Sequence, residues 1–142
     1  MTNAGISTIL MAANAEADQP WVADATAQLA KETDSQVIVL SVDELETELL
    51  ATLPRSEFIR RAEEAATAAV GRLSAAGITA EHEVRSGLAL ENIIAVAQER
   101  NADIIVVGAS VRGHITQRLL GSVPLALIQS SPKPVLVVTG PK

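Results

Sequence analysis

The chain has 142 residues, 48% of them hydrophobic, and a formal net charge of −6. This length suits a single domain over residues 1–142, and the hydrophobic fraction favours a folded chain over a disordered one. The negative charge and the 1% content of aromatic residues disfavour nucleic acid as a partner. The absence of cysteine excludes disulfides and a cysteine nucleophile. Since no apolar run is long enough to cross a membrane and no basic secretion signal is present, we expect no membrane partner and a cytoplasmic location.

The first elements in chain order alternate between strands and helices. Nearly continuous apolar runs over residues 6–12 and 36–42 predict two buried strands. Between them, Pro20 followed by apolar side chains at steps of three and four predicts a helix over residues 20–33. Residues 43–54 are the least regular part of the chain, and we expect a loop there.

Four acidic residues lie near the start of this loop, with leucines among and after them: Asp43, Glu44, Glu46 and Glu48. Carboxylates could recruit Mg²⁺, but a site for such a hard cation needs converging oxygens, and this spacing spreads the side chains apart. We therefore interpret these residues as facing solvent and assign no metal site.

The second half of the chain continues the alternation. Its most regular helix is predicted over residues 55–76, with Gly77 in the C-cap position. The buried face of that helix is expected to carry Phe58, Ala62, Ala65, Ala69 and Leu73. The elements expected next are a half-exposed strand over 78–84, a turn at 86–87, a helix ending near Asn101 and a buried strand over 103–107. A helix over 122–129 and a final strand over 134–139 complete the series.

Strands that alternate with helices predict an α/β fold, a doubly wound parallel sheet with helices on both faces. In such sheets, ligands bind beyond the carboxyl ends of the strands. The turn after the first strand, residues 12–16, contains no glycine, which excludes a dinucleotide fingerprint and a P-loop. The uncharged Asn14 at that turn, and a third strand that ends without aspartate, also exclude a phosphorelay receiver domain.

The turn after the fourth strand is different. Gly108 allows a ligand to approach the backbone closely, and Ser110 and Arg112 supply hydrogen-bond donors. The helix that opens at residues 121–122 presents free N–H groups, which favour an anion. This segment predicts a phosphate cradle, although glycines at strand ends and helix starts are also ordinary turn residues.

Three stretches of sequence make this interpretation more specific: residues 106–108 (VVG), 119–123 (LLGSV) and 132–138 (PKPVLVV). Together they resemble the universal stress protein family, in which the fourth strand ends in glycine, a loop of the form G-x2-G-x9-G-[ST] follows, and a P-x-PVLVV strand closes the chain. The resemblance covers essentially the whole chain. It implies a five-stranded sheet of order 3-2-1-4-5, of the adenine nucleotide alpha hydrolase-like type, and a homodimer. In one branch of that family it also implies bound ATP, with Mg²⁺ only alongside the nucleotide, whereas another branch does not bind ATP.

The resemblance implies a nucleotide site on the ends of the first and second strands and on the loop after the fourth. The residues it places there are Ala12, Ala13, Asn14, Val42 or its neighbour Ser41, Val107, Gly108, Ser110, Val111, Arg112, Gly113, Gly121, Ser122 and Val123. Among them, the positions that match ribose and phosphate contacts are Gly108, Gly121, Ser122 and Val123. Val42 or Ser41 matches the lining of the adenine pocket.

Two positions depart from the family pattern. Val111 stands where the second motif glycine is expected, and a β-branched residue does not adopt positive φ cheaply. Asn14 stands where the family commonly has an acid. Gly113 could restore loop flexibility, and three basic residues could supply positive charge to a polyphosphate, although such side chains are usually only solvated. Those basic residues are Arg112, His114 and Arg118.

No catalytic group is predicted. Ser110 and His114 lack a suitably placed acid, so they do not form a triad, and slow ATP hydrolysis is the most that we expect. His82 lies between Glu81 and Glu83, and we interpret it as a surface residue rather than a metal ligand.

The last strand carries no charge over residues 135–138, although the implied order makes it an edge of the sheet. An unprotected apolar edge predicts pairing with a second copy of the chain. Two hypotheses therefore stay open. The chain is a nucleotide-binding stress regulator, or it is a dimeric stress adaptor that binds no nucleotide and acts through contacts with an unknown protein partner. An enzyme acting on an adenylated or phosphorylated metabolite is a third, less supported alternative, since the sequence offers no visible base or nucleophile for it.

Overall fold

The computed structural model describes residues 5–15, 18–44, 54–109 and 122–140, and over these residues strands alternate with helices as predicted. The elements in chain order are β1 (Thr8–Ala13), α1 (Pro20–Thr33), β2 (Gln36–Glu44), α3 (Arg55–Ala75), β3 (Ala80–Gly87), α4 (Ala89–Glu99), β4 (Ile104–Gly108), α5 (Ser122–Ser130) and β5 (Val135–Val138).

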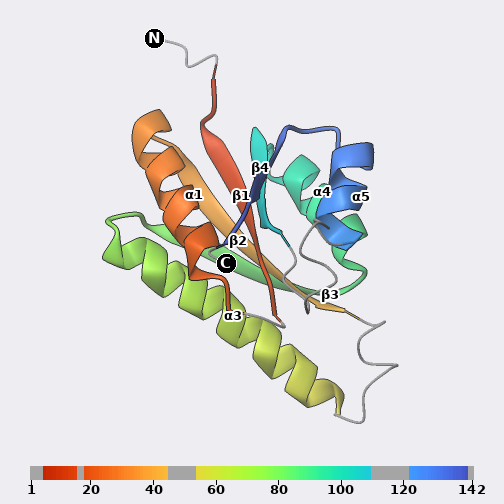
Figure 1. Cartoon of the computed structure of the whole chain (residues 1–142). Helices are drawn as coiled ribbons and strands as arrows, with labels where there is room; N and C mark the ends of the chain where they lie inside the picture. The colour runs from red at the N-terminus through yellow and green to blue at the C-terminus, as the bar shows by residue number, and fades with distance from the viewer. Residues whose placement is uncertain (1–4, 16–17, 45–53, 110–121, 141–142) are drawn as a thin grey trace.

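The strands form one parallel sheet in the order β3-β2-β1-β4-β5, which confirms the predicted fold class and strand order. Helices α1 and α3 cover one face of the sheet, and α4 and α5 cover the other (Figure 1). Strand β1 lies at the centre, with β2 on one side and β4 on the other. The strand order therefore reverses between β1 and β4.

The apolar core is split by the sheet into two layers. On β1, Ile9 and Met11 belong to the layer beneath α1 and α3, whereas Leu10 belongs to the layer beneath α4 and α5. Successive side chains of a strand point to opposite faces, so a strand covered on both sides must be apolar throughout. These three side chains are at most 3% exposed.

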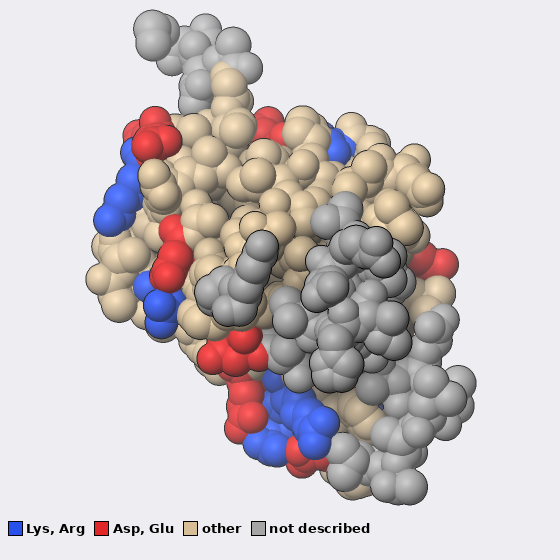
Figure 2. Space-filling view, viewed as in Figure 1, with Lys and Arg blue, Asp and Glu red and all other residues tan. Residues whose placement is uncertain are grey.

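Helix α3 packs through small side chains. Its buried residues are Phe58, Ala62, Ala66, Ala69 and Leu73. The sequence predicted Ala65 in place of Ala66, and this was wrong because the helix presents its buried face at steps of four, four, three and four. Charged residues occupy the outer side, where Figure 2 shows acidic and basic side chains next to each other rather than in patches of one sign.

The carboxyl ends of β2 and β3 extend further than the sequence predicted. The two strands stay paired up to Asp43 opposite Ser86 and Glu44 opposite Gly87. The predicted turn at residues 86–87 was therefore wrong, because strand pairing overrides the local preference of Ser-Gly for a turn.

The expectation that Asp43 faces solvent was also wrong, since this residue is 2% exposed. Its Oδ2 lies 2.9 Å from Nη2 of Arg55, and the hydroxyl of Ser86 donates a hydrogen bond to the same oxygen at 3.2 Å. A buried carboxylate needs such partners, because burial without them is costly. Glu46 and Glu48 lie outside the described residues.

A second carboxylate ties the amino-terminal edge of the sheet. Oδ2 of Asp103, just before β4, accepts hydrogen bonds from the backbone N–H groups of Ser7 at 2.9 Å and Thr8 at 3.0 Å, and from the Ser7 hydroxyl at 3.1 Å. These donors stabilise the ionised form and hold the pKa of Asp103 below its usual value of 3.8. Asp103 thereby joins β1 to β4 at the end opposite the predicted site.

Candidate functional site

The carboxyl ends of β1 and β4 lie side by side at the centre of the sheet. The two strands pair in register, with Met11 opposite Val106, and they end at Ala13 and Gly108. After β1 the chain passes to α1 on one face, and the next described element after β4, α5, lies on the other. Diverging connections of this kind leave a crevice at the strand ends, which is where parallel sheets bind ligands.

Four of the residues predicted for the nucleotide site come together on one side of this edge. Ala12, Val42, Val107 and Val123 all belong to the apolar layer between the sheet and helices α4 and α5. They come from β1, β2, β4 and α5, so only the folded chain places them in one layer. Val42 is 9% exposed and Val107 is 6% exposed. Ala12, Val42 and Val107 lie within two residues of the carboxyl ends of their strands, and Val123 is the second residue of α5.

The remaining predicted residues are placed differently. Ala13 packs into the opposite layer, beneath α1 and α3, and Asn14 is exposed just after β1. Ser122 is the first residue of α5, where the sequence predicted a helix start. The predicted residues that lie outside the described part of the chain are Ser110, Val111, Arg112, Gly113 and Gly121, together with His114 and Arg118.

Strand alternation places the side chains of Val42 and Ser41 on opposite faces of the sheet. Val42 shares a layer with Ala12 and Val107, whereas Ser41 points to the opposite face. Ser41 is fully buried, and its hydroxyl has no hydrogen-bond partner. The second unpartnered atom on this strand is Oδ1 of Asp43, two residues further along and on the same face as Ser41.

Gly108 is required by packing against α1. A Cβ atom at this position would lie 2.7 Å from Cγ2 of Val22 and would also collide with the side-chain oxygen of Gln19. From the sequence, we expected glycine at position 108 because it allows a ligand to approach the backbone closely. The structure adds that the glycine lets the end of β4 lie directly on the first turn of α1.

Gln19 was not singled out from the sequence. It precedes Pro20 at the start of α1, and its Nε2 donates a hydrogen bond to the carbonyl oxygen of Ala109 at 2.8 Å. The N–H of Ala109 in turn donates to the carbonyl of Val138 on β5 at 2.9 Å. Both backbone groups of the residue that follows β4 are therefore held by neighbouring elements.

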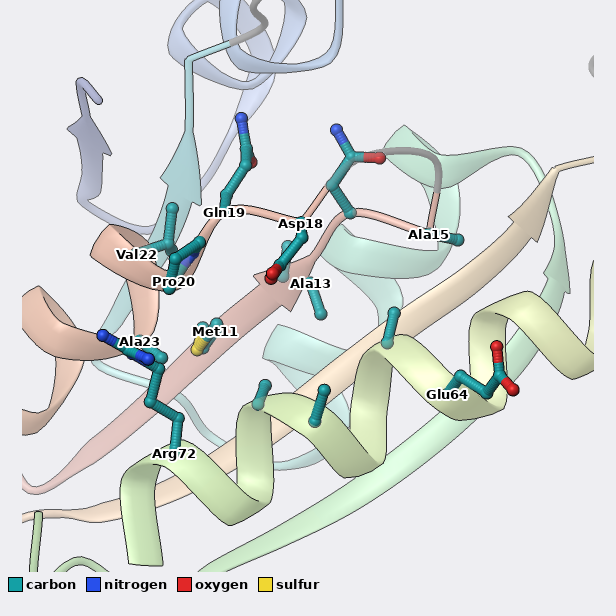
Figure 3. A pocket seen from close by; sticks show the side chains of 15 residues that line it. Met11, Ala13, Ala15, Asp18, Gln19, Pro20, Val22, Ala23, Glu64 and Arg72 are labelled. Atoms are coloured by element: carbon teal, nitrogen blue, oxygen red, sulfur yellow. The ribbon is translucent and has the colours of Figure 1, made fainter. Parts of the chain in front are cut away.

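A cavity of about 250 Å³ lies on the α1 and α3 side of the same edge (Figure 3). Met11 and Ala13 of β1 point into it, Asp18 and Gln19 lie at the turn before α1, and Arg72 comes from α3. The full lining is Met11, Ala12, Ala13, Asn14, Ala15, Asp18, Gln19, Pro20, Val22, Ala23, Glu64, Ala65, Ala68, Ala69 and Arg72. Alanines on β1, α1 and α3 create the space. A stripe of alanines at helical spacing in α3 was the only sequence signal for it.

Arg72 is already paired where it borders the cavity. Its Nε and Nη2 donate to the two carboxylate oxygens of Asp24 at 2.8 and 3.1 Å. The hydrogen bonds from this guanidinium lower the pKa of Asp24 from its usual value. The acids Asp18 and Glu64 also line the cavity, so this side of the edge is a poor place for phosphate groups.

The described residues contain neither a candidate membrane span nor a candidate metal site. None of their helices combines the length and the apolar content that a membrane span requires. Within the same residues, no three His, Asp or Glu side chains are grouped so that they could hold a metal ion.

Comparison with known proteins gives consistent matches. A model of the universal stress protein family matches residues 5–139 of the chain. Universal stress protein Sll1654 of Synechocystis sp. is 35% identical over 135 residues, which are 92% of this chain and 84% of that protein.

Solved structures match the fold over nearly the whole chain. A universal stress protein in complex with cAMP has a TM-score of 0.75 and 23% identity, covering 97% of this chain and 100% of its own. A universal stress protein from Archaeoglobus fulgidus in complex with dAMP has a TM-score of 0.72 and 23% identity, covering 92% of this chain and 96% of its own. At these identities the likeness is one of fold.

Proposed function

Because the chain belongs to the universal stress protein family, we propose that it is a dimeric stress-response regulatory protein that binds adenine nucleotide at the carboxyl edge of its sheet. The observation that carries this proposal is the convergence of Ala12, Val42, Val107 and Val123 beside the start of α5. An apolar surface can pack against a purine, and the free N–H groups at a helix start favour phosphate. Two solved structures of the same fold are complexes with adenine nucleotides, one with cAMP and one with dAMP.

The proposed nucleotide is ATP, and Mg²⁺ would enter only as its counter-ion. The phosphates would lie toward residues 108–122, with Ser122 as a donor at the helix start. The cavity beneath α1 and α3 lies on the other side of the edge, and its acids disfavour polyphosphate. We expect binding rather than catalysis, because Ser110 and His114 lack a suitably placed acid in the sequence.

A second candidate function is a dimeric adaptor that binds no nucleotide and acts through an unknown protein partner. Two residues of this chain favour it. Asn14 brings no negative charge to the exposed turn after β1, and Val111 stands where the family motif has glycine. In both candidates the dimer would form through β5 (Val135–Val138), which lies at the edge of the sheet and exposes Leu136 to 37%.

The two candidates differ in what the purified protein holds. We would denature the protein and identify any released nucleotide by absorbance and mass, then titrate the nucleotide-free protein with labelled ATP. Released adenine nucleotide, or saturable binding below millimolar ATP, is the expected result. No released nucleotide together with no saturation at millimolar ATP would exclude the regulator and leave the adaptor.

A further inference from the structure

We propose that Gln19 is a positioning residue for the segment that leaves β4, acting through the carbonyl of Ala109. The effect on nucleotide affinity rests on the proposed function, whereas the effect on the backbone does not. The two residues are 90 positions apart in the sequence, and their side-chain to backbone hydrogen bond joins the start of α1 to the end of β4. In Figure 3 the side-chain amide of Gln19 extends toward the end of β4.

The side chain of Gln19 does not cap α1. Gln19 occupies the N-cap position but makes no side-chain cap hydrogen bond. Short polar residues such as Ser or Asp are preferred for capping, since their oxygens reach the N–H groups of the first turn. The longer side chain of Gln19 instead spans the gap to β4. Pro20 restricts the backbone conformation of Gln19, and this limits the directions that the Gln19 side chain can take.

The receiving side is equally constrained. Ala109 is 8% exposed, and its N–H is held by Val138 of β5. Gly108 has no side chain, and the amide group of Gln19 lies over the place that a Cβ would occupy, with its Cδ 3.0 Å from that point. The absence of a side chain at Gly108 therefore leaves the space that the amide group of Gln19 occupies.

Fixing the carbonyl of Ala109 fixes the direction in which the chain leaves β4. A peptide unit is planar, so holding one of its atoms restrains the whole unit. Residues 110–121 follow directly in the sequence, and they contain five of the residues predicted to bind nucleotide: Ser110, Val111, Arg112, Gly113 and Gly121. A backbone restrained before binding loses less conformational entropy on binding. Gln19 would thereby raise nucleotide affinity without touching the nucleotide.

The test uses Gln19→Met, which keeps the length of the side chain, adds no charge and removes the donor. Gln28→Met is the matched control, because Gln28 is an exposed glutamine within α1, the helix that Gln19 precedes. Gln19→Ala is a second variant in case methionine repacks the site. Far-ultraviolet circular dichroism and the fluorescence of Trp21, the one tryptophan in the sequence, establish that each variant is folded.

Two readouts separate this proposal from the proposed function. The first is hydrogen exchange of the Ala109 amide in the nucleotide-free protein, because that N–H is protected by its bond to the carbonyl of Val138. We expect exchange there to be roughly fivefold faster in both Gln19 variants, the factor that corresponds to one neutral hydrogen bond, and unchanged in Gln28→Met. Exchange identical to the wild type would overturn the positioning role.

The second readout is ATP affinity, which we expect to fall roughly fivefold in the Gln19 variants and not in the control. Faster exchange with an unchanged ATP affinity would contradict the link to the nucleotide. If the wild type binds no ATP but exchange still rises, the positioning of the backbone stands and the nucleotide-binding function fails. The two failures are therefore distinguishable.

Discussion

The carboxylate of Asp43 and the guanidinium of Arg55 meet at 2.9 Å where β2 ends and α3 begins. The side chain of Asp43 is fully buried, whereas that of Arg55 is 36% exposed. One oxygen of Asp43 already has no hydrogen-bond partner, so the carboxylate depends strongly on the remaining contacts.

This asymmetry predicts unequal effects of removing each partner. Arg55→Met leaves a buried negative charge without its cation, and we expect a loss of about 2–4 kcal/mol in the free energy of unfolding. Asp43→Asn leaves the arginine at a site open to water, and we expect a loss of about 1 kcal/mol. Urea denaturation followed by Trp21 fluorescence measures both. A loss for Arg55→Met no larger than that for Asp43→Asn would contradict the predicted asymmetry, and no loss at all would show that Arg55 does not stabilise the buried carboxylate.

Two glycines provide an internal comparison of packing. Gly108→Ala places a methyl group against Val22 and Gln19, and we expect it to destabilise the protein by about 1–3 kcal/mol. At Gly71, on the exposed side of α3, a Cβ would meet nothing within 4 Å. Gly71→Ala should therefore stabilise the protein by about 1 kcal/mol through helix propensity. Thermal unfolding of the two variants should shift in opposite directions, and a stabilised Gly108→Ala would contradict the described contact.

The hydrogen bonds to Asp103 predict a pH dependence of stability. Because the folded-state pKa lies below the usual 3.8, ionised Asp103 stabilises the fold at pH values above 3.8. That contribution is lost as the pH falls through the lowered folded-state value. Asp103→Asn should cost about 1 kcal/mol at pH 7 and progressively less below pH 3.8. Unfolding free energies of both proteins across this range check it, and a difference that stays constant with pH would contradict it.

Local sequence patterns predicted the elements where a helix or strand signal was strong. Helix α1 begins at Pro20 and ends at Thr33 as predicted, because proline at the first turn and apolar steps of three and four mark it without ambiguity. The strand order followed from the resemblance to a known family rather than from the composition. The end of β3 was missed, since Ser86 and Gly87 form a turn by themselves but pair with β2 in the fold.

The contacts that long-range packing creates could not be read from the sequence. Asp43 is a charged residue of a type that usually lies at the surface. Its burial depends on contacts with Arg55 and with Ser86, which is 43 positions away. The bond from Gln19 to Ala109 spans 90 positions, and no local pattern marks it. The cavity of about 250 Å³ arises from small side chains on β1, α1 and α3, each of which is unremarkable alone.

The edge strand predicts the oligomeric state. A wild-type chain that pairs through β5 should sediment as a dimer, and Leu136→Glu should shift it to a monomer, because a charge would be buried in the paired edge. Leu88→Glu is the matched control, since Leu88 is also 37% exposed but lies before α4, away from β5. Analytical ultracentrifugation gives the masses. A monomeric wild type, or dissociation by both variants, would contradict pairing through β5.

The proposal that the carboxyl ends of β1 and β4 bind ATP is tested most directly by the ATP affinity of two variants within residues 110–121. Gly121→Val puts a branched side chain at a position that the family resemblance assigns to phosphate contact, and it should abolish binding. Val111→Gly restores the glycine of the family motif, and it should strengthen binding relative to the wild type. Isothermal titration with ATP measures all three proteins. Affinities that are the same in both variants and the wild type would place any nucleotide site elsewhere and contradict the account.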